Sequence, residues 1–480
     1  MRILITLLML CSFFSPALLR ASDQMPPVGN SATAGNAAAA GNSATVDVLL
    51  ERAIAENLIA GGVVVIGNHD GIISTSAKGQ LNTAPGSPLL DERTVFDVAS
   101  LTKVIATTPA VMKLLDEGKI RLDDLLSRWF PEFADTEITV LHLLTHTSGL
   151  SDVSVNSEQS MHSAISKAAA QRQRPGTHFS YADINFILLG ELVQRVTGAT
   201  LDQFCQDQIY RPLGTQETMF LPPRDFTFPI APTSGLNGGV VQDPNARRLG
   251  GVAGHAGLFS SAYDLSRYAR LILGRGMLDN QRILSEQVVA QMTTPYLCNN
   301  GRVIRGLGWD IASPFSAPKG SFFSGTSFGH TGYSGSSIWI DPAQDLFVIL
   351  LTRRVNYRDT RSFNQLRRDV STFAVADLKM PELVPGLTQT WQEARVKVKP
   401  VQVAEVPKRV ASSHARKMVA KAEPRVKLQR AHGRSAKAER MLAKAGAGRR
   451  AARVAQIARV AKSERCKTTP AKKKRILPKS

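Results

Sequence analysis

Residues 94–118, TVFDVASLTKVIATTPAVMKLLDEG, place a serine and a lysine three positions apart, where a strand-like run gives way to a helical one. On a helix, positions i and i+3 share a face, so the ammonium of Lys103 can reach the hydroxyl of Ser100. A nearby base activates a serine hydroxyl, and a lysine is such a base if burial lowers its pKa. The alternative is a serine helix cap followed by an exposed lysine. The apolar helix that follows, closed by Gly118, favours a buried lysine.

The N-terminal segment has the pattern of an export signal. Arg2 precedes the apolar run ILITLLMLCSFF, and small residues follow near Ala21. This run is too short to span a bilayer, so residues 1–21 are predicted to be a cleaved signal peptide and the protein to be periplasmic or secreted. Residues 22–45 are rich in Ala, Gly, Asn and Ser, which predicts a flexible linker.

The C-terminal segment holds the positive charge of the chain. Residues 393–480 contain 27 Lys/Arg and 5 Asp/Glu, whereas the whole chain has a net charge of +20, so the rest is nearly neutral. Residues 381–480 have almost no aromatic side chains, which predicts a disordered tail. In an exported protein such a tail is expected to contact anionic cell-envelope polymer or lipid rather than nucleic acid. A solvated tail without a partner is the alternative.

The body, residues 46–380, has strand-like runs at both ends and helical patterns between them. After a first helical stretch, VVVIG and a second run beginning Ile72-Ile73 flank the turn Asn68-His69-Asp70-Gly71, which predicts a hairpin. Near the end, SSIWI and LFVILLTRR flank a Pro/Asp turn. The pattern predicts an α+β body with one sheet made from both chain ends and a helical insertion.

Cysteine and histidine spacing gives little support for a disulfide framework or a metal site. Cys205 and Cys298 can form one bridge, but sequence leaves that open. His142 and His146 have the i, i+4 spacing of zinc ligands, but position 143 is leucine rather than the glutamate of the zinc-peptidase motif. We therefore expect no metal there.

Two later segments carry further candidate site residues. FSYADINFILLGELVQRVTG contains Tyr181, whose hydroxyl beside the serine and lysine can relay a proton to a leaving group; a core aromatic is the alternative. SFGHTGYSGSSIWI contains His330, Thr331 and Gly332 at a strand entry, where the glycines let backbone approach a ligand. The N–H groups of Ser100 and Tyr333 can then form an oxyanion hole, unless this segment is an ordinary polar loop.

In their order along the chain, these pieces resemble the serine β-lactamase and penicillin-binding-protein family, in its class C β-lactamase, DD-carboxypeptidase and esterase branch. The resemblance spans roughly residues 46–375. It implies an antiparallel sheet flanked by helices plus a helical subdomain, with the active site between them, and acyl-enzyme chemistry without metal or cofactor. Supporting stretches are DVASLTK, LLTHTSGL, FSYADINFILLGELVQRVTG, GGVAGHAGLFSSAYDLSRY and GHTGYSGSSIWIDP.

The resemblance assigns roles to individual residues. Ser100 resembles the nucleophile, Lys103 the base and Tyr181 the proton shuttle. His330, Thr331 and Gly332 resemble the third motif, which binds substrate. His255, among glycines in GGVAGHAGLFS, is a further candidate for the lining of the cleft, because loop glycines often mark close backbone approach.

Two positions depart from the β-lactamase pattern. Asp183 replaces the usual asparagine, and an ionised aspartate only accepts hydrogen bonds, so it disfavours a substrate group contacted through its carbonyl oxygen. Alternatively Asp183 pairs with Lys103, raises its pKa and weakens it as a base. His330 replaces the usual lysine, so a fixed positive charge is lost near neutral pH.

Both departures make efficient β-lactam hydrolysis unexpected, so a weak class C-type β-lactamase is only a further alternative. The sequence favours an exported serine hydrolase that acts through an acyl-enzyme on a small acyl, peptide or peptidoglycan-derived substrate, as a D-alanyl-D-alanine carboxypeptidase or an esterase. The main alternative is a non-catalytic protein of the same fold that binds cell wall or polyanion through its basic tail.

Overall fold

The computed structural model describes most of the chain between the predicted signal peptide and the basic tail. The predicted signal peptide at 1–21 lies outside the described residues, as does nearly all of the predicted tail at 381–480. No helix within the described part is long and apolar enough to cross a membrane. The described ranges are 36–155, 161–170, 173–233, 235–298, 300–378 and 401–402.

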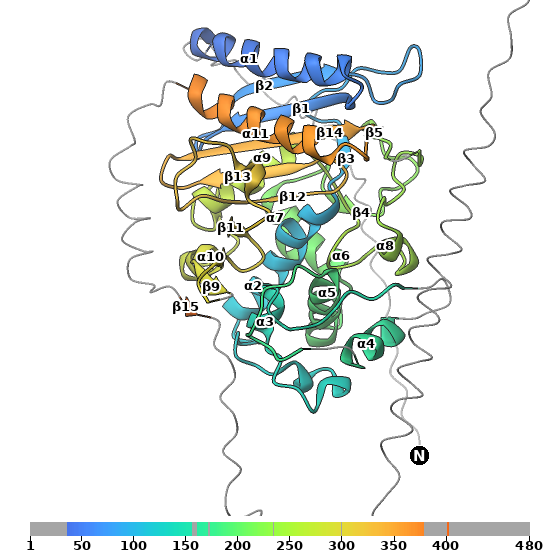
Figure 1. The fold of residues 1–480 in the computed structure, drawn as a ribbon, viewed down its shortest axis with the longest axis vertical. Helices are drawn as coiled ribbons and strands as arrows, with labels where there is room; N and C mark the ends of the chain where they lie inside the picture. Colours follow the sequence, from blue (N-terminus) through green and yellow to red (C-terminus); the bar gives the residue numbers. More distant parts are fainter. Residues whose placement is uncertain are drawn as a thin grey trace, which may run out of the picture. The chain divides into compact units, whose positions relative to one another are not determined.

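A nine-stranded sheet, in the order β15-β9-β10-β11-β12-β13-β14-β1-β2, runs from the top of the described structure in Figure 1, at β2, down to β9 and β15. Its pairs are antiparallel except for β15 and β9. The first and last strands of the predicted body lie side by side near the β2 edge of the sheet, because β1 pairs with β14. The strands are β1 (Ile59–Gly67), β2 (Ile72–Gly79), β9 (Tyr296–Cys298), β10 (Val303–Arg305), β11 (Asp310–Ala312), β12 (Phe328–Thr331), β13 (Ser337–Asp341), β14 (Leu346–Arg354) and β15 (Val401–Gln402).

Strand β1 is buried on both faces, which explains its nearly continuous apolar sequence. Val64 and Ile66 pack in the cluster formed with the terminal helices α1 (Asn36–Ala55) and α11 (Thr360–Asp377), which lie together over one face (Figure 1). Val63 packs in the larger cluster on the other face. Because successive side chains of a strand point to opposite faces, one run of valines holds both layers on the sheet.

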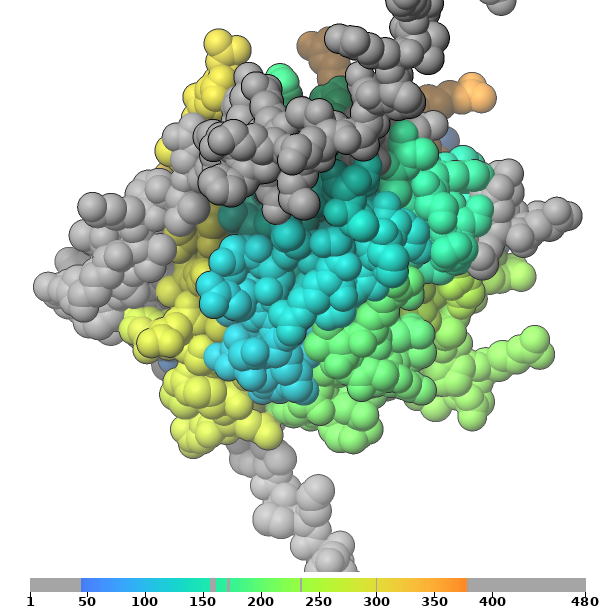
Figure 2. Space-filling model, turned by 90° about the horizontal axis from the view of Figure 1, so that it is seen from below, coloured from blue at the N-terminus to red at the C-terminus, as the bar shows by residue number. Residues whose placement is uncertain are grey.

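Helices make up most of the lower part of the described structure in Figure 1, and β4-β6-β3-β5 form a second sheet. Figure 2 views this part from below, where cyan and green segments lie against one another. The bounds are α2 (Thr108–Asp116), α3 (Val140–Leu144), α4 (Met161–Ala170), α5 (Asp183–Thr197), α6 (Leu201–Cys205), α7 (Arg211–Leu213), α8 (Pro244–Arg248), α9 (Ala262–Leu273), α10 (Glu286–Thr293), β3 (Val95–Asp97), β4 (Met219–Phe220), β5 (Ile230–Ala231), β6 (Leu258–Ser261), β7 (Met277–Leu278) and β8 (Gln281–Arg282).

The structure confirms the predicted α+β class, with strands from both chain ends in one antiparallel sheet. Two details differ from expectation. Helix α1 begins at Asn36, inside the predicted linker, where the four alanines that follow favour helix. Two residues of the predicted tail, Val401–Gln402, pair with the edge strand β9, whose backbone groups are open to a further strand. Cys205 and Cys298 are buried free thiols, so no bridge joins them.

Candidate active site

The candidate nucleophile lies in a tight turn at the end of β3. Ala99–Leu101 form one 3₁₀ turn, and Ala99 has a positive φ of 47°. The carboxylate of Asp97 accepts a hydrogen bond from the N–H of Ala99 at 2.8 Å, which holds this turn. Ser100 stands in the first turn of a helix, where N–H groups have no partner within the helix and remain open to an oxyanion.

Lys103 is fully buried at the start of a π-helical turn, Lys103–Thr107, that leads into α2. Its ammonium donates to the Ser100 hydroxyl at 3.1 Å and to the carbonyl of His255 at 3.0 Å. It also lies 2.7 Å from Oδ1 of Asp183, the first residue of α5. The contact predicted from the Ser-x-x-Lys spacing is therefore present, and a carboxylate shares the ammonium.

The carboxylate of Asp183 sets the charge state of this corner. Burial is the largest influence on the pKa of Lys103 and acts to lower it, but the Asp183 carboxylate and the Tyr181 hydroxyl together outweigh burial and raise the pKa. Burial likewise acts to raise the pKa of Asp183, and the Lys103 charge reverses that effect, so this pKa is lowered. The two groups form an ammonium–carboxylate pair. Of the two consequences that the sequence left open for Asp183, pairing with Lys103 is the one observed.

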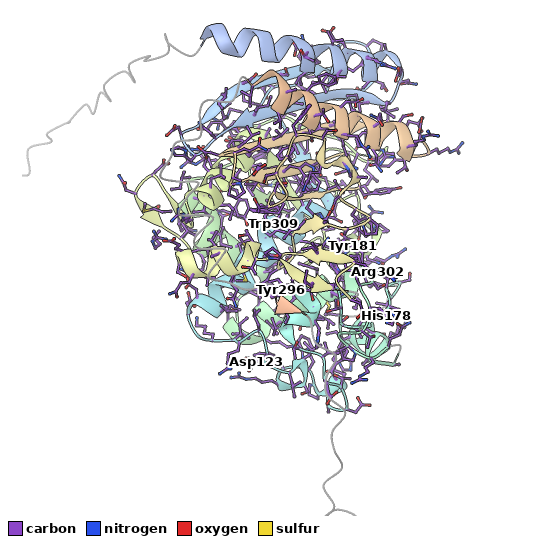
Figure 3. The ribbon with its side chains drawn as sticks, turned by 60° about the vertical axis from the view of Figure 1, so that its left-hand side comes forward. Asp123, His178, Tyr181, Tyr296, Arg302 and Trp309 are labelled. Atoms are coloured by element: carbon purple, nitrogen blue, oxygen red, sulfur yellow. The ribbon has the colours of Figure 1, made fainter. Side chains whose placement is uncertain are left out.

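Tyr181 lies between the sheet and the helical part (Figure 3). Its ring stacks on the buried ring of His146, with centroids 4.5 Å apart, and the ammonium of Lys103 lies 5.2 Å from its centroid. Phe315 covers it at 5.0 Å. Packing on three sides fixes the ring beside the Ser100–Lys103 pair, as the proposed proton shuttle requires.

The segment predicted as the third motif docks directly on the nucleophile turn. At Gly332 an added Cβ would lie 2.3 Å from the carbonyl oxygen of Val98, so no side chain fits there. The hydroxyl of Ser336 donates to this same carbonyl at 2.8 Å, and that of Ser334 donates to the carbonyl of Asp97 at 2.6 Å. These contacts place Tyr333 next to the turn that carries the nucleophile.

His330 carries no fixed charge near neutral pH. Burial, followed by the charges of Arg305 and Lys103, holds the pKa of His330 well below its usual value. Its Nδ1 lies 2.9 Å from the carbonyl of Thr331 and donates to it, which leaves Nε2 as a hydrogen-bond acceptor. The loss of the lysine charge that the sequence predicted at this position therefore holds in the structure.

A cavity of about 310 Å³ opens beside the nucleophile. Predicted site residues that line it are Ser100, Tyr181, His330, Thr331, Gly332 and Tyr333. Sequence reasoning missed the remaining wall, whose residues come from β10, β11, β14 and α11 and their flanking loops. These residues are Arg305, Asp310, Phe315, Arg354, Thr360, Asn364 and Arg367.

Two of the three arginines of the cavity have no anionic partner among the described residues. Arg305 is paired with Asp310 at 3.1 Å. Within the described ranges Arg354 and Arg367 make no ion pair with a carboxylate: Arg354 donates to the carbonyl of Tyr333 at 3.4 Å, and Arg367 donates to that of Ser336 at 2.9 Å. Burial, and then the neighbouring charge of Arg354, lower the pKa of Arg367. Two buried cations that have no carboxylate partner among the described residues give this end of the cavity the charge to bind an anion.

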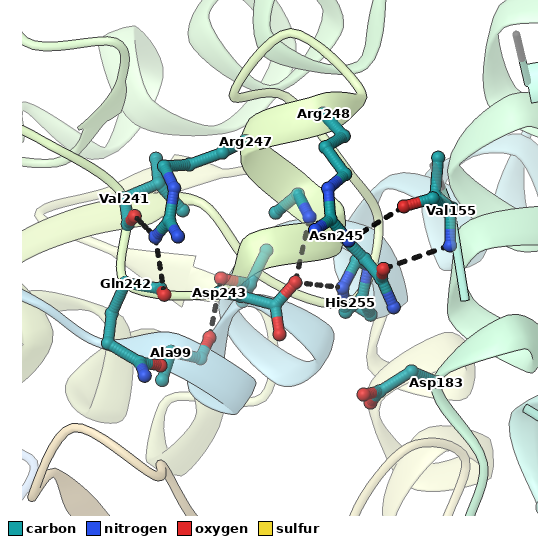
Figure 4. Close-up of polar contacts among 12 residues, drawn as sticks. Ala99, Val155, Asp183, Val241, Gln242, Asp243, Asn245, Arg247, Arg248 and His255 are labelled. Carbon is teal, nitrogen blue, oxygen red and sulfur yellow. Dashed lines mark hydrogen bonds and ion pairs between the residues drawn. The ribbon is translucent and has the colours of Figure 1, made fainter. Parts of the chain in front are cut away.

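His255 reaches the site through its main chain. Its side chain is buried, does not line the cavity, and bonds Oδ1 of Asp243 through Nε2 at 2.9 Å (Figure 4). Burial acts to raise the pKa of Asp243, but the bond and charge of His255 lower it to about 2. The carbonyl of His255 holds Lys103. The prediction that His255 lines the cleft thus differs from the structure, in which glycine-rich backbone makes the contact.

One group of possible metal ligands occurs among the described residues. Ligand atoms of Asp183, Asp243 and His255 lie within 4.8 Å of one another, but the ammonium of Lys103 is already bound to Asp183. The histidine pair considered from the sequence contacts different groups: Nδ1 of His142 lies 3.0 Å from the Thr139 hydroxyl, and His146 stacks on Tyr181.

Comparison with known proteins gives a consistent result. The family model described as Beta-lactamase matches residues 46–371. A protein of Salmonella agona (strain SL483), provisionally named a D-alanyl-D-alanine carboxypeptidase, is 29% identical over 341 residues, which cover 61% of this chain and 78% of the relative. A relative with the same name from Salmonella schwarzengrund (strain CVM19633) is 30% identical over the same shares.

Solved structures share the fold at low sequence identity. A class C β-lactamase is 20% identical with a TM-score of 0.60, over 72% of this chain and 99% of that one. EstCE1, a hydrolase with promiscuous acyltransferase activity, is 22% identical with a TM-score of 0.58, over 70% and 99%. The octameric penicillin-binding protein homologue from Pyrococcus abyssi is 22% identical with a TM-score of 0.54, over 65% and 73%.

Proposed function

The chain belongs to the β-lactamase family of serine hydrolases, and on that premise we propose that it is an exported peptidase that removes a C-terminal residue bearing a free carboxylate, as a D-alanyl-D-alanine carboxypeptidase does. The name of the Salmonella relatives supports the reaction. The sequence pattern of the first 21 residues supports export.

The proposal rests on Arg354 and Arg367, which line the same cavity as Ser100 and have no carboxylate partner among the described residues. In a C-terminal peptide, the carboxylate carbon is three covalent bonds from the scissile carbonyl carbon. A substrate held by Ser100 therefore carries its anion into the same cavity. Guanidinium groups bind carboxylates with two parallel hydrogen bonds, which fixes both the position and the orientation of the departing residue.

In the proposed reaction the Ser100 hydroxyl adds to the scissile carbonyl, and the N–H groups of Ser100 and Tyr333 bind the developing oxyanion. The hydroxyl proton passes to Lys103 or Tyr181 and then to the departing amine as the C–N bond breaks. Water then releases the acyl group from the serine. Because Asp183 raises the pKa of Lys103, the base form becomes available at alkaline pH, and the rate is expected to rise with pH.

The test compares N-acetyl-lysyl-D-alanyl-D-alanine with the same peptide amidated at its C-terminus. Wild-type protein should release D-alanine from the free acid and cleave the amide poorly. Arg354→Gln should raise KM for the free acid by about tenfold or more, because a charge-assisted hydrogen bond contributes about 1.5–3 kcal/mol.

The neighbouring Arg353 is the matched control for this variant. It is half-buried, donates to the carbonyl of Arg354 and does not line the cavity, so Arg353→Gln should leave KM near the wild-type value. Equal cleavage of the acid and the amide by wild-type protein would contradict the assignment, as would equal effects of the two variants.

A second candidate function is a non-catalytic wall- or polyanion-binding protein, and the Lys103–Asp183 pair favours it because a paired ammonium is a weak base. It predicts no Ser100-dependent release of D-alanine from the peptide. It also predicts that removal of residues 393–480 abolishes retention on peptidoglycan or heparin. Equal retention with and without these residues would exclude the tail as the anchor.

A further inference from the structure

The carboxylate of Asp97 holds two chain segments that are distant in sequence. Asp97 ends β3 and is 2% exposed. Its Oδ1 accepts from the N–H of Ala99 at 2.8 Å, and its Oδ2 accepts from the N–H of Gln242 at 2.6 Å. One buried group thus satisfies a donor beside the nucleophile and a donor in the loop before α8. Buried N–H groups that lose such a partner are costly, so the contacts resist separation of the two segments.

The first contact stabilises an unusual backbone conformation. Ala99 has a φ of 47°, in the left-handed region, which is strained for an L-residue with a side chain. Its N–H is held by Asp97, two residues earlier, so the carboxylate favours the turn that Ser100 needs. Without this acceptor we expect Ala99 to leave the left-handed conformation, which would displace the hydroxyl of Ser100.

The second contact leads to the lysine. Gln242 precedes Asp243, whose carboxylate holds the ring of His255 at 2.9 Å, and the carbonyl of His255 accepts from Lys103 at 3.0 Å. Figure 4 shows this loop, with Asp243 between Gln242 and His255 and with Asp183 nearby. The path from Asp97 to the ammonium therefore consists of three hydrogen bonds and a short run of backbone.

The main chain of the same turn also binds residues 334 and 336, which flank the proposed oxyanion donor Tyr333. The hydroxyl of Ser334 donates to the carbonyl of Asp97 at 2.6 Å, and that of Ser336 donates to the carbonyl of Val98 at 2.8 Å. A shift of residues 97–99 would displace Tyr333, whose N–H is the second proposed oxyanion donor. Nucleophile, base and oxyanion donor therefore share one support.

We propose that Asp97 is a positioning residue for the reaction at Ser100, whose buried carboxylate sets the placement of the Ser100 hydroxyl against the Lys103 ammonium. This inference rests on the proposed serine-hydrolase function and assigns that site an additional residue. Asp97 touches neither the cavity nor the reacting atoms, so its effect passes through the backbone of Ala99 and Gln242.

The charge state of Asp97 gives the proposal a signature in pH. Burial raises its pKa to about 6, against the opposing effect of the N–H groups of Gln242 and Ala99. Of the charged groups that face it, Asp243 acts to raise this pKa and Arg247 acts to lower it. Protonation places an O–H opposite one of the two N–H donors, so the support weakens as the pH falls through about 6.

The experiment measures hydrolysis of p-nitrophenyl butyrate by the full mature chain and its Asp97→Asn variant between pH 5 and 9, with Ser100→Ala as background. The variant retains the shape of the side chain, but its amide NH₂ faces an N–H donor. We expect kcat to fall about tenfold or more with KM within twofold, because small displacements of reacting groups have large effects on rate. The step near pH 6 that we expect in wild-type protein should be absent from the variant.

Asp341→Asn is the matched control. Asp341 is fully buried at the end of β13 and accepts from the N–H and hydroxyl of Ser324, away from the cavity. Its replacement should lower thermal stability with kcat and the pH profile unchanged. A similar loss of kcat in both variants at similar loss of stability would overturn the proposal, as would an Asp97→Asn variant with wild-type kcat and the step retained.

A measurement on wild-type protein keeps the proposal testable if the variant does not fold or no ester is hydrolysed. The backbone amide proton of Ala99, followed by NMR, should shift with a midpoint near pH 6. An amide shift that stays flat from pH 5 to 8 would overturn the role of Asp97. Absence of Ser100-dependent turnover on both the ester and the peptide would instead contradict the proposed function, so the two failures are distinguishable.

Discussion

The two ends of the candidate active site differ in whether their positive charges are paired with a carboxylate of the protein. At the inner end Lys103 is fully buried and bound by Asp183, Ser100 and the carbonyl of His255. At the outer end Arg354 and Arg367 line the cavity, and within the described residues neither has a carboxylate partner. The charge of Lys103 is neutralised by a carboxylate of the protein, whereas those of Arg354 and Arg367 have only neutral hydrogen-bond partners among the described residues.

This difference separates catalysis from recognition. A buried ammonium without a partner would be costly, so Asp183 stabilises Lys103, but the same carboxylate weakens it as a base. The arginines of the cavity wall have no carboxylate partner among the described residues, so a substrate carboxylate can pair with them. Variants at the Lys103 end should therefore alter kcat or its pH dependence. Variants at the arginine end should alter the affinity for the substrate carboxylate.

The largest expected effect separates the two ends completely. Ser100→Ala removes the nucleophile and should lower turnover of N-acetyl-lysyl-D-alanyl-D-alanine by about a thousandfold or more, yet leave the arginines in place. Calorimetry should show that this variant binds the free-acid peptide with an affinity near the wild-type KM. Turnover that survives the substitution would place the chemistry elsewhere, and loss of binding would show that recognition depends on Ser100.

A smaller, directional effect is expected at the inner end. Asp183→Asn removes the charge that raises the pKa of Lys103, and burial then lowers that pKa. The free amine becomes available at lower pH, so the alkaline rise of kcat should move down by at least about one pH unit, with a gain of about tenfold at pH 7.

The control for Asp183→Asn is Glu191→Gln on the same helix, where Glu191 pairs with Arg195 at 3.0 Å. It should leave the pH profile unchanged. If the Asp183 variant loses activity at every pH with no shift of the profile, Asp183 holds the substrate or the lysine in place, and its charge does not set the pH dependence.

The smallest expected effect distinguishes the ends by salt. Raising NaCl from about 0.05 to about 0.5 M should raise KM for the free-acid peptide about threefold, because salt screens the attraction between the arginines and a carboxylate that approaches from solvent. The buried Lys103–Asp183 pair is screened far less, so kcat should stay constant. The amidated peptide serves as the control. An equal salt effect on KM for both peptides would show that the arginines do not bind the carboxylate.

Local sequence was sufficient to predict the inner end of the site. Ser100 and Lys103 lie within one helical turn, so their contact follows from spacing and from the apolar helix behind them. Tyr181 and Gly332 come from other segments, and their place at the site was predicted from the order of motifs. The α+β class followed from strand patterns at both ends of the body.

The outer end could not be predicted in this way, because it exists only after the chain has folded. Arg354 ends the last strand of the antiparallel core, and Arg367 lies within α11, a helix with other basic residues. Nothing in their local sequence distinguishes cavity residues from surface charge. The contact of the His255 carbonyl with Lys103 could not be predicted either, because any residue type can supply a main-chain carbonyl. The one available signal was a cluster of arginines near the end of a nearly neutral body.

Because β1 pairs with β14, the active site can be completed only late in translation. The segment with Ser100 and Lys103 leaves the ribosome early. The backbone groups of β1 that pair with β14 have no partner until the strand that begins at residue 346 has been translated. Contacts between such distant segments form late. Arg354 and Arg367 emerge later still, so a nascent chain holds its nucleophile without a site around it. Any chain that terminates before β14 is translated should be inert as an enzyme and should require a chaperone to remain unaggregated.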